Sequence, residues 1–328
     1  MRRRTFLQGL ASTSAYPLLG IRSLVAQQAG GSRPRLGVLI YSNPRTDPNT
    51  ASLLRGLSDV GYVDGQTIDI TFRAAEGQLD RLHGLAKELV ALKPNLIFSL
   101  GSDVTAVAIK VVQNVPLVFV SSADPVQLGF VGSLARPGGQ VTGVTLLLDE
   151  LASKRLELLK EAAPGISRVA IFWNPDHVES ELQLAERAAA NIGVTSIQMP
   201  LRGSQDTAAA LAAATEAKAD ALYVVSSRQT VLEIGKFVEY ATRHRVPLAG
   251  GWGAWTQAGA LLSYGPNVDE MLRLAAGYVP KIIKGTMPAD LPVQQPTRFE
   301  LHVNLKTARA LGLSMPEAFL LRADKIIE

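Results

Sequence analysis

The sequence contains no cysteine. Disulfide bonds, thiolate catalysis and a lipid-modified cysteine anchor are therefore excluded. The only histidines are His83, His177, His244 and His302, and no HExxH or other paired spacing joins them. We expect no metal site, because zinc sites in proteins use several ligands at recurring spacings.

The motifs of nucleotide binding and of ester hydrolysis are also missing. Lys236 is followed by Phe237 rather than by the Ser or Thr of a phosphate-binding loop, and the glycines at 250, 251 and 253 lack the dinucleotide-binding spacing. No Gly-x-Ser-x-Gly nucleophile elbow occurs. The sequence thus indicates no cofactor and gives no sign of an enzyme of these classes.

No apolar run reaches the length of about 20 residues that a membrane-spanning helix needs. Hydrophobic residues still make up 47% of the 328 residues, which is enough for the cores of two ordinary domains. Residues 1–26 hold four of the 33 basic residues and no acidic residue, so the remainder has 29 basic and 29 acidic residues. A neutral remainder without a basic stripe argues against a nucleic-acid partner.

Residues 1–26 have the pattern of an export signal. The arginines at 2, 3 and 4 supply a charged start, a mildly apolar stretch follows, and the small residue Ala26 suits a cleavage site. The run Arg3-Arg4-Thr5-Phe6-Leu7 resembles the twin-arginine export motif. We expect a twin-arginine signal peptide over residues 1–26 and a mature protein in the periplasm. The alternative is an amphipathic helix that belongs to the folded protein.

From residue 35 onward, short β-branched runs alternate with helical patterns, which predicts parallel sheets with right-handed crossovers. The pattern restarts at about residue 168, and matching runs recur about 125 to 133 residues apart, which indicates two lobes of similar topology. In the first half we expect strands at 36–41, 67–73, 95–100 and 116–120, and helices at 49–59, 78–92 and about 102–113.

The sequence therefore predicts an α/β protein with two similar lobes, each with a parallel sheet flanked by helices, and a ligand cleft between the lobes. The join lies in residues 138–148. A strand at 260–264, a helix at 268–283 and a proline-marked tail follow the second half, so we expect the chain to cross between the lobes more than once. The expected boundaries are 33–145 plus about 258–286 for the first lobe, and 146–257 plus about 287–328 for the second.

In open parallel sheets, ligands bind beyond the carboxyl ends of the strands, where the amides of helix starts point outward. The expected strand ends combine hydroxyls, aromatic rings and carboxylates. This mixture suits a small ligand with a carboxylate, an amine and an apolar body, such as an amino acid, whose ammonium an Asp would bind. Each Ser, Asn or Asp at these positions can instead cap a helix and have no role in ligand binding. The candidate ligand-binding residues are Tyr41, Ser42, Gly101, Ser102, Ser121, Ser122, Asp124, Trp173, Asn174, Ser226, Ser227, Trp252 and Tyr264.

Several motifs occur in the order in which one known family has them. They are Ser122-Ala123-Asp124-Pro125-Val126, Arg136-Pro137-Gly138-Gly139, Phe172-Trp173-Asn174-Pro175, Leu262-Ser263-Tyr264-Gly265 and Leu291-Pro292-Val293-Gln294-Gln295-Pro296. With them, residues 35–328 resemble the substrate-binding proteins of ABC transporters that are related to the tryptophan- and tyrosine-binding members. The resemblance implies a type I periplasmic binding fold, a ligand between the lobes, and a membrane permease with its ATPase as partners.

The chain departs from this family at two places in the expected ligand layer. These are Gly101-Ser102-Asp103-Val104 and the segment 248–252, where many relatives have other residues. The resemblance alone therefore does not assign the family's aromatic amino acid to this chain.

We expect an exported solute-binding protein, not an enzyme, which delivers an amino acid or a related carboxylate to an ABC importer. One alternative is an α/β enzyme that uses Asp124, Asp176 or His177 as acid or base, because a fold alone does not determine function. A second alternative is a sensory ligand-binding protein, whose sequence would look the same.

Overall fold

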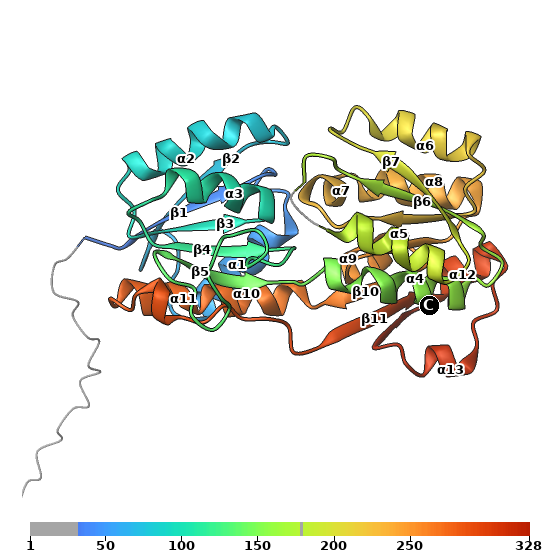
Figure 1. The fold of residues 1–328 in the computed structure, drawn as a ribbon. Helices are drawn as coiled ribbons and strands as arrows, with labels where there is room; N and C mark the ends of the chain where they lie inside the picture. Colours follow the sequence, from blue (N-terminus) through green and yellow to red (C-terminus); the bar gives the residue numbers. More distant parts are fainter. Residues whose placement is uncertain (1–31, 178–179) are drawn as a thin grey trace, which may run out of the picture. The chain divides into compact units, whose positions relative to one another are not determined.

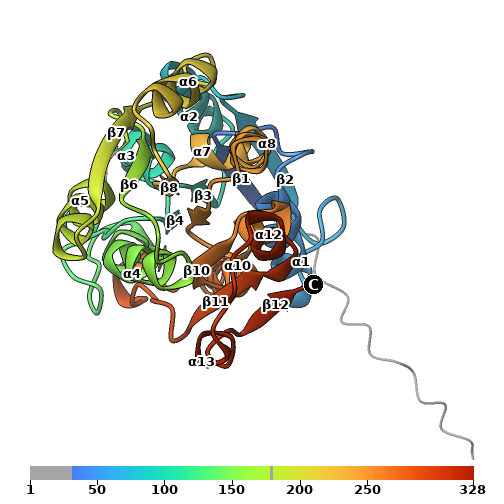
Figure 2. The ribbon, with the colours of Figure 1, turned by 90° about the vertical axis from the view of Figure 1, so that its right-hand side faces the viewer.

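A computed structural model describes residues 32–177 and 180–328. The expected export signal lies outside these residues. From Arg33 to Glu328 the chain forms one compact unit. It contains two β-sheets, each covered by helices (Figures 1 and 2). Within the described part, none of the helices combines the length and the apolar character that crossing a bilayer would require.

The first lobe is a five-stranded parallel sheet in the order β2-β1-β3-β4-β5. Helices α2 and α3 pack together on one face of this sheet, and α1 packs against α10 on the other face (Figure 1). The elements of this lobe are β1 (Arg35–Ile40), α1 (Pro48–Asp59), β2 (Asp69–Ala74), η1 (Leu79–Arg81), α2 (Leu82–Ala91), β3 (Leu96–Leu100), α3 (Ser102–Val111), β4 (Leu117–Ser121), β5 (Val141–Thr145), α10 (Val268–Ala276), α11 (Tyr278–Ile283) and η3 (Pro288–Asp290).

The second lobe is a seven-stranded sheet in the order β12-β11-β10-β9-β8-β6-β7. Figure 2 shows α4 and α5 on one face of its parallel part and α6 and α8 on the other. Its elements are η2 (Asp149–Leu151), α4 (Ala152–Ala162), β6 (Arg168–Trp173), α5 (Glu181–Asn191), β7 (Thr195–Pro200), α6 (Thr207–Glu216), β8 (Ala221–Val224), α7 (Arg228–Leu232), α8 (Ile234–His244), β9 (Leu248–Gly250), α9 (Gly253–Ala258), β10 (Leu262–Pro266), β11 (Phe299–Asn304), α12 (Leu305–Leu311), α13 (Glu317–Leu320) and β12 (Lys325–Ile327).

The two sheets repeat one strand order. The run β2-β1-β3-β4-β5 corresponds to β7-β6-β8-β9-β10, which confirms the two similar lobes that the recurring runs predicted. The second sheet has two further strands, β11 near the strand that the sequence predicts at about 299–305, and β12; their pairing was not predicted. Strand β11 pairs antiparallel with β10, and β12 extends the sheet beyond it.

Local sequence explains where the elements next to the cleft begin. Asp47 caps α1 by accepting a hydrogen bond from the Asn49 amide at 2.9 Å, and Pro48 occupies the first helical turn, where its missing N–H costs nothing. Ser227 and Thr230 form a reciprocal capping box at the start of α7. Gly61, at φ +87°, lies just beyond the end of α1.

The chain crosses between the lobes three times, at 146–148, 266–268 and 295–298. The return to the first lobe begins later than the residue 258 that we expected, because β10 pairs with β9 and β11 of the second sheet. The final crossing is also later than the expected 287. Val293 donates to the Leu134 carbonyl at 2.7 Å and Gln294 bridges to Val144, so this segment extends the edge of the first sheet.

Candidate ligand cleft

The carboxyl ends of both sheets face a small cavity, the inner cavity, of about 30 Å³. Pockets that hold small ligands have volumes of about 300 Å³ or more. A ligand of that kind therefore enters the inner cavity only if the lobes part. The lining residues are Asn49, Leu100, Gly101, Val120, Ser122, Leu146, Leu148, Ser226, Ser227, Arg228, Trp252 and Val268.

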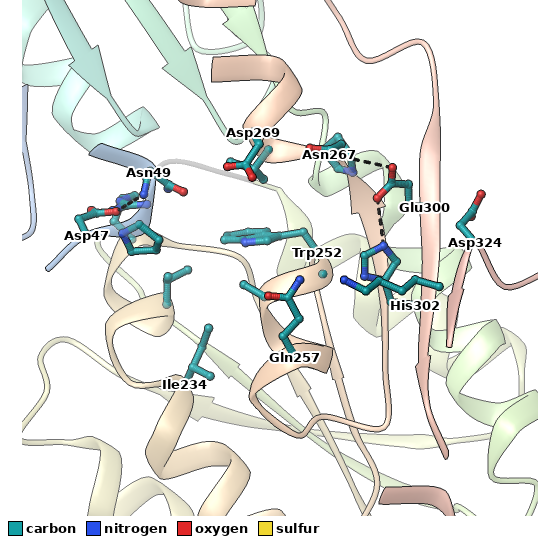
Figure 3. A pocket seen from close by; sticks show the side chains of 18 of the residues that line it. Asp47, Asn49, Ile234, Trp252, Gln257, Asn267, Asp269, Glu300, His302 and Asp324 are labelled. Carbon is teal, nitrogen blue, oxygen red and sulfur yellow. Dashed lines mark hydrogen bonds and ion pairs between the residues drawn. The ribbon is translucent and has the colours of Figure 1, made fainter. Parts of the chain in front are cut away.

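A larger cavity of about 770 Å³ lies beside the inner one, next to the crossings at 266–268 and 295–298. Trp252 projects between the side of Asp47 and Asn49 and the side of His302 (Figure 3). His302 Nε2 lies 3.0 Å from a Glu300 carboxylate oxygen. The residues that line both cavities, and so separate them, are Asn49, Arg228, Trp252 and Val268.

A third cavity of about 340 Å³ includes Tyr41 and Ser42 from the first lobe and Gln229 and Glu233 from the second. The Tyr41 hydroxyl donates to the Gly77 carbonyl at 2.7 Å. Burial, and secondarily the negative charges of Asp103 and Glu233, raise the pKa of Tyr41 above its usual value. This phenol therefore stays neutral at physiological pH.

Polar contacts cross the cleft and hold the lobes together. Arg228 of α7 forms an ion pair with Asp47 and donates to Ser42 Oγ at 3.1 Å. His177 Nδ1 lies 2.6 Å from the carboxylate of Asp103 in α3. Because both contacts join residues of different lobes, the described structure is a closed arrangement of the cleft.

Arg228 is the one cation among the described residues that line the inner cavity, and its side chain is 10% exposed. Burial lowers the pKa of Arg228 to about 10, so the guanidinium remains charged at neutral pH. Its Nε is buried and has no hydrogen-bond partner in the described part of the chain. The same holds for the buried hydroxyl of Ser226. Two polar groups without partners thus line one cavity.

A buried network lies directly behind this cavity. Arg155 of α4 pairs with Glu181 of α5, and both side chains are 0% exposed. Tyr223 donates to Glu181 at 2.7 Å, and burial raises the pKa of this tyrosine well above its usual value. The Ser226 amide donates to Glu181 at 3.1 Å. The network therefore fixes the backbone at the end of β8, where the ligand layer begins.

Arg155 also holds two of the three crossings between the lobes. Its Nη2 donates to the Leu148 carbonyl at 2.9 Å, and its Nε donates to the Tyr264 carbonyl at 2.8 Å. Leu148 ends the first crossing, and Tyr264 lies two residues before the second. One guanidinium thus connects the ligand layer to the segments about which the lobes would move.

The structure brings seven of the predicted ligand residues to the cavities. Five line the inner cavity and two line the third cavity. They are Gly101, Ser122, Ser226, Ser227 and Trp252 in the first group and Tyr41 and Ser42 in the second.

The remaining predicted residues lie behind or beside the cleft. The hydroxyl of Ser102 bonds those of Ser121 and Ser122 at 2.9 and 2.8 Å, and so supports the cavity wall. Asp124 accepts from the Val126 amide at 2.8 Å, as a turn residue does. Asn174 donates to Gln229 at 2.7 Å.

Two of the predicted aromatic residues line none of the three cavities. Trp173 packs against the second-lobe core, and its buried Nε1 has no partner among the described residues. The Tyr264 ring packs against Phe299, with 6.1 Å between the ring centroids. Trp173 ends β6 as expected, whereas Tyr264 lies within β10, which continues to Pro266. Both side chains belong to the layer that supports the second sheet.

Sequence reasoning missed Arg228 although this residue directly follows the predicted Ser226 and Ser227. A charged residue shortly after the buried strand β8 could have indicated this position. Asn49, Leu148 and Val268 were also missed. They reach the cavity from a helix start and from the crossings, and no strand-end pattern predicts those positions.

The fold and its cleft define the class of protein. Two similar α/β lobes, joined by three crossings with a cavity between them, form a type I periplasmic binding fold. A family model for the ABC transporter substrate binding proteins matches residues 38–327, and the chain belongs to this family.

Individual relatives agree with this assignment. The chain is 25% identical over 277 residues to a tyrosine-binding protein from Clostridioides difficile, with 84% of this chain and 79% of the relative covered. It is similar to a conserved domain protein from Vibrio cholerae, with a TM-score of 0.83, 26% identity and coverage of 90% and 100%. An ABC domain in complex with L-Trp from Streptococcus pneumoniae gives a TM-score of 0.80 at 23% identity, with the same coverage.

Proposed function

We propose that this chain is an exported solute-binding protein that captures a small molecule between its lobes and delivers it to an ABC permease and its ATPase. The observation that carries the proposal is the inner cavity, which lies where the strand ends of both sheets meet and is lined by polar groups without partners among the described residues. Strand ends of this kind are where ligands of open α/β sheets bind.

The proposed ligand is an amino acid or a related carboxylate. Support comes from the hydroxyls and the guanidinium beside the inner cavity, because a carboxylate accepts strong hydrogen bonds from both. A tyrosine-binding relative and a similar structure in complex with L-Trp support a ligand of this size and chemistry.

An enzyme that acts on this ligand has less support. Asp176 is exposed, and the structure places both Asp124 and Asp176 outside the three cavities. His177 is held against Asp103 across the cleft. We therefore propose binding without turnover, and recovery of every bound compound unchanged after incubation with the protein would agree with this.

The first test is ligand-dependent closure of the mature protein. A thermal-shift screen of amino acids and small carboxylic acids should find a ligand, because one that binds the native state stabilises it by about 2.7 kcal/mol at one hundred times Kd. Solution scattering should then show a smaller radius of gyration with the ligand than without it, because the lobes close about three crossings. A compound without a thermal effect is the control. A tight ligand that leaves the scattering curve unchanged would count against the proposal.

The second test concerns export. We propose that the segment 1–26 directs the chain through the twin-arginine route to the periplasm, on the strength of Arg3-Arg4-Thr5-Phe6-Leu7. Replacing Arg3 and Arg4 with Lys should leave unprocessed precursor in the cytoplasm, as measured by fractionation. Arg22→Lys keeps the motif and should be exported normally. Normal secretion of the double variant would refute this route.

A further inference from the structure

The inner cavity has a one-sided charge. Among the described residues, its lining includes one guanidinium and no aspartate or glutamate. Two carboxylates beside and behind the cavity already have partners: Asp47 pairs with Arg228, and Glu181 pairs with Arg155. Asp103 is held by His177. An ammonium group in this cavity would therefore lose its water without gaining a carboxylate of its own, which is unfavourable in a buried site.

An anion, in contrast, finds donors ready. The Nε of Arg228 and the hydroxyl of Ser226 are both buried without a partner among the described residues, and both residues line the cavity. Asp47 and Ser42 hold the other end of the guanidinium, so its planar fork has a fixed orientation. Charge-assisted hydrogen bonds from such a group are stronger than those between neutral partners.

The backbone around Arg228 is shaped to admit this side chain. Gly101 has φ +111°, a conformation that favours glycine, and a Cβ there would lie 2.8 Å from Cγ of Arg228. The arginine stem therefore crosses directly over the end of β3. Because Gly101 has no side chain, Arg228 of the second lobe can place its positive charge at the strand ends of the first lobe.

Half of the lining residues are apolar, and Asn49, Ser122 and Ser227 add further polar groups. The apolar members come from both lobes and from the crossings, and they are Leu100, Val120, Leu146, Leu148, Trp252 and Val268. A ligand that suits this surface has an anionic head and a hydrocarbon or aromatic body.

We propose that the ligand of this chain is a carboxylic acid without an ammonium group, with its carboxylate bound by Arg228 and Ser226 and its apolar body against Leu148 and Trp252. The inference rests on the proposed function and narrows its ligand class. It separates this chain from proteins that bind zwitterionic amino acids, because such a ligand needs an acidic partner and the described lining of the inner cavity contains none.

The experiment compares carboxylic acids with amino acids that share the same body. The pairs are 3-phenylpropanoate with phenylalanine, 4-methylpentanoate with leucine, and indole-3-propanoate with tryptophan, each titrated calorimetrically into the mature protein. In at least one pair the acid should bind, and in every pair that binds the acid should be tighter by at least about tenfold. The matching amines, which lack the carboxylate, should not bind.

Three variants locate the head group. Arg228→Met should weaken binding of the acid by at least about tenfold. Asp47→Asn keeps the cap of α1, removes the competing carboxylate and should strengthen acid binding. Arg243→Met is the matched control, because this arginine lies on α8 with a side chain 69% exposed. If Arg228→Met fails to fold because Asp47 is left unpaired, the double variant Asp47→Asn/Arg228→Met gives the same measurement.

The outcomes separate this inference from the proposed function. An amino acid that binds more tightly than its acid, or an Arg228→Met protein that binds the acid like wild type, overturns the carboxylic-acid assignment. If the amino acid or the acid that binds still reduces the radius of gyration, the proposed function stands. If none of the compounds binds, the carboxylic-acid assignment fails, and the proposed function fails with it if the wider screen also finds no ligand.

Discussion

Replacing Arg155 with methionine should lower the free energy of unfolding by about 3–5 kcal/mol, because it leaves the carboxylate of Glu181 buried without its cation. The change also removes the donors to the Leu148 and Tyr264 carbonyls. Equilibrium unfolding in urea measures this loss through the midpoint, and the m-value shows whether the transition stays cooperative.

Lys154→Met is the matched control, because this neighbour on the same helix has a side chain 49% exposed and pairs with exposed Glu157. Its loss should stay below about 1 kcal/mol, as for surface ion pairs generally. Equal losses for the two variants would show that the network around Arg155 contributes no more than a surface contact.

Gly265→Ala should destabilise the protein by about 3 kcal/mol or more, since an added Cβ would overlap the backbone carbonyl of Gly251. Backbone cannot rotate away as a flexible side chain can, so β9 and β10 would have to separate. Gly251 directly precedes Trp252, and the same change should therefore move this indole at the inner cavity. Unfolding midpoints report the first effect, and tryptophan fluorescence reports the second.

The control for this substitution is Gly84→Ala in α2. An added Cβ meets no atom within 4 Å there, and alanine should stabilise the helix by about 0.5–1 kcal/mol. If Gly265→Ala kept the wild-type midpoint and fluorescence, the close approach of β10 to Gly251 would be wrong.

The repeated βα pattern predicted the fold, because hydrophobic runs and helix periods are local properties of the sequence. The expected strand at 95–100 coincides closely with β3, and the restart expected at about residue 168 is the first residue of β6. Strand β7 gave no comparable signal, since it lies at a sheet edge with mostly part-exposed residues. The antiparallel β10–β11 pair joins segments about 35 residues apart, and no local pattern encodes such a pairing.

The site was predictable only where it depends on strand ends. Ser226, Ser227 and Trp252 follow strands of the second sheet and line the inner cavity as that rule predicts. Arg228 and Asp47 come together from opposite lobes. Their pairing depends on how the lobes meet, which spacing along the chain does not reveal.

The three crossings make each lobe dependent on residues synthesised late. The first lobe needs α10, which packs on α1 although more than 200 residues separate them, and it needs the edge contact of Gln294 with Val144. The second needs β10 and β11 to complete its sheet. Contacts of such long range slow folding, because the chain must close large loops before it gains them. A nascent chain that ends at residue 257 therefore contains neither lobe complete, and both should reach their native packing only after nearly the entire polypeptide has been made.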